Sequence, residues 1–414
     1  MMYKKFKEKY KTTPVQYFFK EREIKNSLIM DLFNTLFLIY YYDIYKKRGK
    51  DKNENLINIE VENLEVFKKL KSKIEELTDF MSNEKWNINF IKKEVQENII
   101  SNQKLFSPPE KKFEVISLLS GGLDSFTGIF YNRNKKTKFV GYRINDLESQ
   151  SQKKLKEFIK EQNNESEFIL YELKNAEKKQ VYTQRTRSLF FFGLGIVEAY
   201  LSNLDKVNIY ENGIMSLNIP INYSRITTKT THPKTLFLLN SILKDLNLNI
   251  KIENTCMSKT KAEMVADLSS EYKAQIKNTM TCGVNRIYPE YHNDKYSHCG
   301  ACVPCLLRKI TIAANNLENM ENLEKPYQIP YDYSIYNQTG NNFLNNEYKS
   351  GIMYFIYLKN AILNGEINNY LNRAPRKYYP NEDDYKQRKK MLLKFAKEVE
   401  YFLKKYPNIL KEEE

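Results

Sequence analysis

The sequence predicts an α/β protein built on a parallel sheet, and three observations support this fold class. Short apolar runs alternate with longer segments of helical spacing, the pattern of parallel strands joined by crossover helices. A turn rich in Ser and Gly follows the first of these runs and opens a helix, where open α/β sheets place their ligands. Cysteines at metal-ligand spacing follow the last expected strand. We therefore expect a ligand-binding sheet domain that carries a metal-stabilised segment.

The first hundred residues predict a small α+β unit that precedes the sheet domain. The expected helices and strands are Glu23–Lys47, Leu56–Val61, Val66–Phe80 and Trp86–Ile91. Ser107-Pro108-Pro109 then breaks the chain and predicts a domain boundary. Because residues 1–107 contain no catalytic constellation, we expect them to form an accessory or docking domain.

The sheet domain is expected over residues 111–317, and a helical extension over residues 318–414. The expected strands are Phe113–Leu119, Lys138–Ile144, Glu167–Tyr171, Val207–Tyr210 and Ile250–Glu253. The expected helices of this domain are Ser125–Asn132, Ser149–Gln162, Arg187–Ser202, Pro233–Leu246 and Lys259–Ser269. The extension is loop-rich and is expected to contain the helices Glu347–Leu363 and Asp383–Lys405.

Charge and hydropathy limit the classes of function and location. The 414 residues carry a formal net charge of +15, which suits a polyanionic partner such as nucleic acid. The basic residues are dispersed and form no dense block, so biased composition is the alternative explanation. No signal peptide is evident, and the most apolar stretch, Leu28–Tyr42, is too short to span a bilayer. We therefore expect a cytoplasmic protein without membrane contact.

The turn after the first strand has the composition of a phosphate-binding loop. Its residues are Ser120, Gly121, Gly122, Leu123, Asp124 and Ser125. Two glycines allow a tight turn and close approach of a ligand, and the following helix N-terminus favours an anion. The acidic Asp124 fits such a cradle if a cation accompanies the anion, so phosphates with Mg²⁺ are expected. An ordinary βα turn is the alternative, because Ser, Gly and Asp are common in turns.

Four of the five cysteines predict a zinc site. They are Cys282, Cys299, Cys302 and Cys305, and the last three form two overlapping C-x-x-C steps. Four soft ligands with no open position describe structural zinc. A redox dithiol and incidental core cysteines are the alternatives, and His292 or His298 could replace one thiolate. Cys256 lies outside the pattern and is expected to be a buried thiol.

Together these motifs resemble the 7-cyano-7-deazaguanine synthases (QueC), a family of PP-loop ATP pyrophosphatases. The resemblance covers about half of the chain, Phe113 to Thr311, and also rests on Thr260-Lys261-Ala262-Glu263 and on the segment Cys299–Arg308. It implies a PP-loop fold (adenine nucleotide alpha hydrolase-like) with a zinc knuckle. It also implies ATP-dependent adenylation of a 7-deazaguanine carboxylate, with release of pyrophosphate.

The chain departs from that family in three places. It has an N-terminal region, a long tail, and an altered substrate region around Glu211–Pro220. The two added regions are similar to the QueC-like QatC proteins of anti-phage operons. This likeness implies transfer of the activated group to an amine, either ammonia or the N-terminus of an operon-encoded protein partner.

The resemblance and the chemistry assign expected roles at the nucleotide. The Ser120–Ser125 loop would hold the pyrophosphate of ATP, Asp124 would lie beside Mg²⁺, and Lys261 would neutralise a phosphate. Arg185 and Arg187 could bind a phosphate or the substrate carboxylate, because a guanidinium fork suits both. A solvated helix face is the alternative for these two arginines.

Roles toward the substrate and the amine are also expected. Glu211, followed by Asn212 and Gly213 at a strand end, could hydrogen-bond a deazapurine edge; a simple turn is the alternative. His232 could act as a general base on the incoming amine, or could only cap a helix.

Two other functions stay open at this point. A PP-loop enzyme that modifies tRNA would fit the basic charge, although the four-cysteine knuckle and the lack of a basic arm disfavour it. A non-catalytic, zinc-stabilised nucleotide-binding subunit would fit the motifs, although the intact loop with Asp124 disfavours it.

Overall fold

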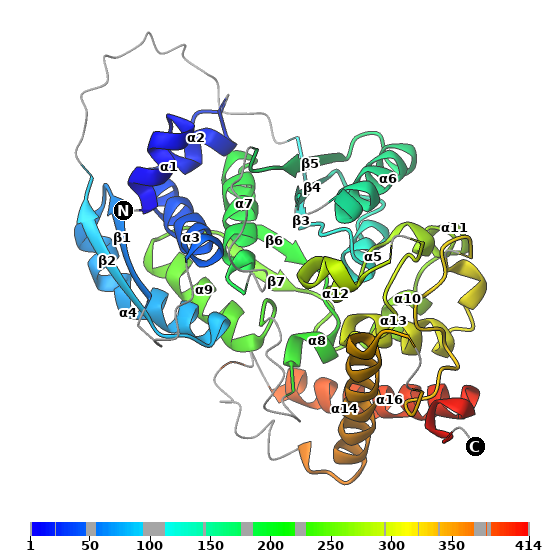
Figure 1. Ribbon diagram of the computed structural model, residues 1–414. Helices are drawn as coiled ribbons and strands as arrows, with labels where there is room; N and C mark the ends of the chain where they lie inside the picture. The colour runs from blue at the N-terminus through cyan, green and yellow to red at the C-terminus, as the bar shows by residue number, and fades with distance from the viewer. Residues whose placement is uncertain are drawn as a thin grey trace.

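The centre of the computed structural model is a parallel sheet with strand order β5-β4-β3-β6-β7 (Figure 1). The structure describes residues 2–20, 22–46, 55–93, 112–143, 146–174, 185–219, 229–293, 295–321, 323–337, 340–367, 378 and 382–412. The strands are β3 (Val115–Leu118), β4 (Thr137–Tyr142), β5 (Glu167–Tyr171), β6 (Lys206–Ile209) and β7 (Lys251–Asn254). The chain runs from β3 outward to β5 and then returns to place β6 on the other side of β3. This reversal of strand order is where open α/β sheets bind ligands.

The predicted α/β fold class is confirmed, because all five predicted strands of the sheet domain are present and pair in parallel. The connecting helices are α5 (Leu123–Tyr131), α6 (Asp146–Gln162), α7 (Arg187–Leu201), α9 (Pro233–Asp245) and α10 (Lys261–Ala266). α10 is shorter than predicted, because Ser269 adopts an extended conformation and begins the separate helix α11 (Ser270–Lys273).

Hydrophobic cores cover both faces of the sheet. Ile116 of β3 and Val140 of β4 belong to the core that contains residues of α7 and α9. Leu119, just after β3, and Phe139 belong to the core with α5 and α6. Neighbouring residues of a strand point to opposite faces, so these near-continuous apolar runs are explained by burial on both sides.

The N-terminal elements share the first of these cores. α3 (Ser27–Tyr45) is buried on almost all sides and packs against α7, in keeping with an apolar composition all round. Phe33 and Phe37 of α3 contact Phe190 of α7, with ring centroids 5.9 and 5.0 Å apart. α1 (Met2–Tyr10) and α2 (Pro14–Phe18) were not predicted; both pack against α3.

The rest of the N-terminal region is a parallel β-α-β unit beside α9. It consists of β1 (Asn55–Val61), α4 (Leu64–Ser82) and β2 (Trp86–Lys92), close to the predicted bounds. The predicted boundary at Ser107–Pro109 lies outside the described residues.

A third core joins the cysteine segment to the C-terminal helices. Its helices are α8 (Gly213–Leu217), α12 (Gly283–Ile287), α13 (Val303–Ala314), α14 (Asn342–Leu363) and α16 (Glu382–Lys405). Of these, α14 and α16 were predicted, α14 with a later start at Glu347, and α13 was not predicted. Short 3-10 turns occur at Ile276–Asn278, Pro289–Tyr291, Glu318–Met320 and Pro407–Leu410. The N-terminal elements and α14 and α16 lie at opposite ends of the view in Figure 1. Within the described ranges, no helix combines the length and apolar character needed to cross a bilayer.

Candidate functional site

The Ser120–Ser125 loop joins β3 to α5 at the point where the strand order reverses. Gly121 has φ +89°, a conformation that glycine adopts at little cost. Its carbonyl accepts hydrogen bonds from the Met280 amide at 2.9 Å and from the Ser151 hydroxyl at 3.1 Å. The loop is therefore held from two other segments of the chain.

The loop presents the N-terminus of α5 without a side-chain cap among the described residues. Gly122 occupies the cap position, and its amide donates to the Ser120 hydroxyl at 3.3 Å. The hydroxyls of Ser120 and Ser125 lie 3.1 Å apart. Amide donors of the first turn, the helix dipole and two hydroxyls thus converge on one place, which is the chemistry of an anion-binding site.

Asp124 lies in the first turn of α5 and is 8% exposed. Its Oδ2 accepts a hydrogen bond from Asn212 Nδ2 at 2.9 Å and lies 3.3 Å from Lys261 Nζ. Its buried Oδ1 has no hydrogen-bond partner within the described part of the chain. A buried carboxylate oxygen without a partner is costly, so a cation or a ligand donor is expected there. Magnesium, which prefers oxygen ligands, fits this atom.

Two short helices deliver the neighbours of Asp124. Asn212 caps α8: its Oδ1 accepts from the Met215 amide at 3.1 Å, which leaves its Nδ2 to donate to Asp124. Lys261 is the first residue of α10 and lies within the capping box formed by Thr260 and Glu263. It is 3% exposed, so its ammonium faces Asp124 inside the protein. The structure therefore brings three predicted residues together from three parts of the sequence.

Glu211 follows β6, and its backbone is clamped by a residue that the sequence did not single out. The Asn254 side chain accepts from the Glu211 amide at 3.1 Å and donates to its carbonyl at 2.9 Å. Asn254 also lines a cavity of about 710 Å³ between α9, β7 and α16. Its position at the carboxyl end of a strand was the signal available in the sequence.

Two other predicted site residues make contacts with the N-terminal region. Arg185 Nη1 donates to the carbonyl of Ser82, at the end of α4, at 2.8 Å. His232 caps α9, since its Nδ1 accepts from the Lys234 amide at 3.1 Å, and its ring packs edge-on against Phe80. Burial and then the charge of Lys229 lower the pKa of His232 to about 3. The capping role of His232 is thus present in the structure, while a role as general base stays a prediction.

Arg187, the first residue of α7, is half-buried. Burial raises the pKa of the Tyr40 and Tyr142 phenols, and the positive charge of Arg187 opposes this increase. Those phenols belong to the aromatic contact between α3 and β4. A role of Arg187 toward a phosphate or carboxylate stays a prediction.

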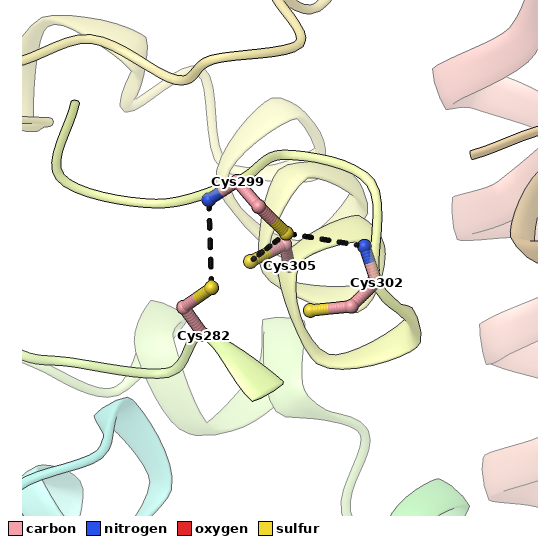
Figure 2. Close-up of side chains that lie close together, drawn as sticks. All are labelled: Cys282, Cys299, Cys302 and Cys305. Atoms are coloured by element: carbon pink, nitrogen blue, oxygen red, sulfur yellow. Dashed lines mark hydrogen bonds between the residues drawn. The ribbon is translucent and has the colours of Figure 1, made fainter. Parts of the chain in front are cut away.

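The four predicted cysteines come together in one buried cluster (Figure 2), with sulfur atoms all within 4.8 Å of one another. The Cys299 and Cys305 sulfurs are 3.8 Å apart, the separation expected for two ligands at about 2.3 Å from one tetrahedral zinc ion. Backbone amides point at the sulfurs, as those of Cys302 and Gly283 do toward Cys299 and Cys302 at 3.4 and 3.3 Å. Such donors favour thiolates. These four residues could therefore hold a metal ion such as zinc.

The two histidines near the cluster are not part of it among the residues described. His298 Nε2 accepts a hydrogen bond from the Thr281 amide at 3.2 Å, so this nitrogen already has a partner. Neither His292 nor His298 joins the group of possible metal ligands. Cys256 is buried elsewhere, and burial raises the pKa of its thiol to about 12, as expected for an inert thiol.

The cysteine cluster and the Ser120–Ser125 loop are joined by the segment 279–282. Met280 donates to Gly121, while Thr279 accepts from Arg308 Nη1 at 2.6 Å. Arg308 is fully buried and also pairs with Glu321 at 2.9 Å. An ordered cluster would thus help to hold the loop in place.

No family model matches this chain, and no curated protein matches it in a sequence search.

Proposed function

We propose that this chain is a PP-loop ATP pyrophosphatase that activates a carboxylate. One observation carries the proposal: Asp124, a buried carboxylate whose Oδ1 has no hydrogen-bond partner among the described residues, lies beside Lys261 at the N-terminus of α5. Hydrogen-bond donors for an anion, an ammonium group and a ligand for a cation together suit a triphosphate with Mg²⁺ better than a simple anion. The position at the reversal of strand order supports the same conclusion.

The proposed reaction has two steps. A substrate carboxylate oxygen attacks the α-phosphorus of ATP, the bond from that phosphorus to the bridging oxygen breaks, and pyrophosphate leaves. An amine then attacks the acyl carbon, AMP leaves with the electron pair of the C–O bond, and the amine releases a proton to solvent.

The residues of the site would act on the charge that develops in the first step. The amides of the first turn of α5 and the hydroxyls of Ser120 and Ser125 would hold the departing pyrophosphate. Asp124 Oδ1 would hold Mg²⁺, which supplies charge neutralisation at the phosphates. Lys261 would lie between Asp124 and a phosphate, and the cysteine cluster, with zinc bound, would be structural.

We propose a 7-deazaguanine carboxylate as substrate, with ammonia or the N-terminus of a partner protein as the amine. The motifs that resemble QueC and its anti-phage relatives support this choice, and a cytoplasmic site of action would follow. The cavity beside Asn254 offers room for a planar heterocycle: it is lined by Phe237, Tyr378 and Arg388, which present aromatic and cationic surface. Asn254 connects this cavity to Glu211, the residue before Asn212.

The test is AMP formation by the full-length protein with ATP, Mg²⁺ and 7-carboxy-7-deazaguanine, with and without ammonia, followed by mass spectrometry. Asp124→Asn should lower AMP formation on the order of 100-fold or more, because the charged ligand is lost. Asp267→Asn is the matched control, since Asp267 pairs with Lys259 on the half-exposed surface. Absence of AMP in every mixture, or full activity of Asp124→Asn, would refute the proposal.

A further inference from the structure

Asp124 depends on two helices that are too short to be stable by themselves. α8 and α10 contain 5 and 6 residues, well below the length at which a helix is stable in isolation. They nevertheless present Asn212 and Lys261 to the same carboxylate oxygen. Something else must hold their first turns in place, and α16 contacts both.

The first contact is made by Glu398 of α16. Thr260, the cap of α10, accepts from the Glu263 amide at 3.0 Å and donates its hydroxyl proton to Glu398 Oε1 at 2.5 Å. The other member of the capping box, Glu263, is ion-paired with Lys394, one turn earlier on α16. Both members of the capping box around Lys261 are therefore bound to α16.

The second contact is made by Met391 of α16, which is 1% exposed. Gly213, the first residue of α8, has its Cα against the Met391 methyl and the Met257 carbonyl, and a Cβ there would overlap both. This close packing fixes the start of α8 directly after Asn212. α16 thus reaches the starts of both helices that meet at Asp124.

We propose that α16 is part of the active site and that Glu398 is a positioning residue. Glu398 holds Thr260 in place, and Thr260 in turn keeps Lys261 beside Asp124. The C-terminal extension is then a clamp that completes the phosphate site, not an appended module. In its catalytic consequence this inference rests on the proposed function.

The experiment compares Glu398→Ala, Glu398→Gln and wild type in the full chain. Amide hydrogen exchange of peptides that cover α10 reports the clamp without any need for activity. Glu398→Ala should speed exchange in α10 and lower kcat/KM for AMP formation by up to about 100-fold, because a small displacement of Lys261 misplaces a charge. Glu398→Gln should keep both α10 exchange and kcat/KM near the wild-type values, because its amide oxygen still accepts a hydrogen bond from the Thr260 hydroxyl.

Two further variants keep the test decisive. Glu400→Ala is the matched control, because Glu400 lies on the same helix and pairs only with the exposed Lys404 among the ion pairs of the described residues. Lys394→Met, at a position whose side chain is 61% exposed, is a milder loosening of the same cap if Glu398→Ala does not fold. It should change α10 exchange and kcat/KM in the same direction.

Each outcome bears on one statement. Unchanged exchange in α10 with Glu398→Ala would overturn the clamp, and faster exchange with unchanged kcat/KM would overturn the positioning role. A Glu398→Gln protein as impaired as Glu398→Ala would overturn the hydrogen bond as the cause. If the wild type forms no AMP, the proposed function fails, while hydrogen exchange still decides whether Glu398 holds α10.

Discussion

Asp124 shows which parts of a site a sequence can reveal at the scale of single residues. Its place in a Ser–Gly–Gly–x–Asp–Ser turn after an apolar run predicted it as a site residue, and a resemblance to the QueC motif predicted Lys261. The bond from Asn212, and the support from Glu398 through Thr260, could not be predicted. Such contacts join distant segments, and they follow from how helices pack rather than from periodicity or turn chemistry.

Glu398 should make stability depend on pH in the neutral range. Burial and then the nearby Glu263 raise the pKa of Glu398 to about 7, against the opposing Thr260 hydrogen bond and Lys394 charge. In the unfolded chain the Glu398 carboxyl loses its proton near pH 4.3. The contribution of the protonated Glu398 to the free energy of unfolding is therefore full below that pH and is lost as the pH rises to about 7.

Glu398→Gln removes this titration. The free energy of unfolding of the variant should therefore rise relative to that of the wild type by about 2–3 kcal/mol between pH 5 and pH 8. Urea unfolding at pH 5, 6, 7 and 8 measures it, with Glu400→Gln as the exposed control. Curves for Glu398→Gln and wild type that run parallel over this range would contradict the assignment.

At the scale of elements, most regular helices and strands were predicted closely, whereas short helices near the site and the longer α13 were missed. α14 and α16 show sustained helical periodicity, and both matched their predicted C-terminal ends. α8 and α12 contain 5 residues each, too few for a period to be visible. Caps, sulfur contacts and neighbouring helices hold them, and none of these leaves a periodic pattern.

The cysteine segment is an element that we expect to need its metal. Its four thiols lie on a loop, at the start of the short α12 and at the start of α13, and metal binding to such a cluster supplies folding free energy. The purified chain should therefore contain one zinc ion, measurable by inductively coupled plasma mass spectrometry. Cys302→Ser should lose zinc, lower the melting temperature and weaken ATP binding, because Met280 would hold Gly121 less firmly.

Cys256→Ala is the control for this prediction, because Cys256 is buried outside the cluster. It should keep its zinc and bind ATP as the wild type does. Stoichiometric zinc in Cys302→Ser would contradict the role of Cys302 as a zinc ligand. ATP binding that a strong chelator leaves unchanged would contradict the link between the cluster and the Ser120–Ser125 loop.

At the scale of the whole molecule, the central question is whether the N-terminal region is a separate domain. Its place before a Pro-containing break predicted an accessory unit, yet α3 and α7 belong to one hydrophobic core. A buried ion cluster crosses the same contact: Arg22 donates to Glu198 of α7 at 2.7 Å, and Lys138 of β4 lies 2.7 Å from that carboxylate. The sequence could not predict the packing of α3 against α7, since an apolar composition does not specify which surface a helix will pack against.

A shared core should make the two regions unfold together. Trp86, the only tryptophan, lies in β2 and reports the N-terminal region by fluorescence, while far-ultraviolet circular dichroism reports the whole chain. If the N-terminal region and the sheet unfold together through the core that α3 and α7 share, the two signals should give coincident transitions in denaturant. Phe37→Ala, in α3, should shift both by about 3–5 kcal/mol, because it leaves a cavity between α3 and α7. Tyr357→Ala, at a 54% exposed position of α14, should shift neither appreciably. If Phe37→Ala moved the fluorescence transition alone, residues 1–107 would be an independent domain, and the core contact would be an interface between two domains.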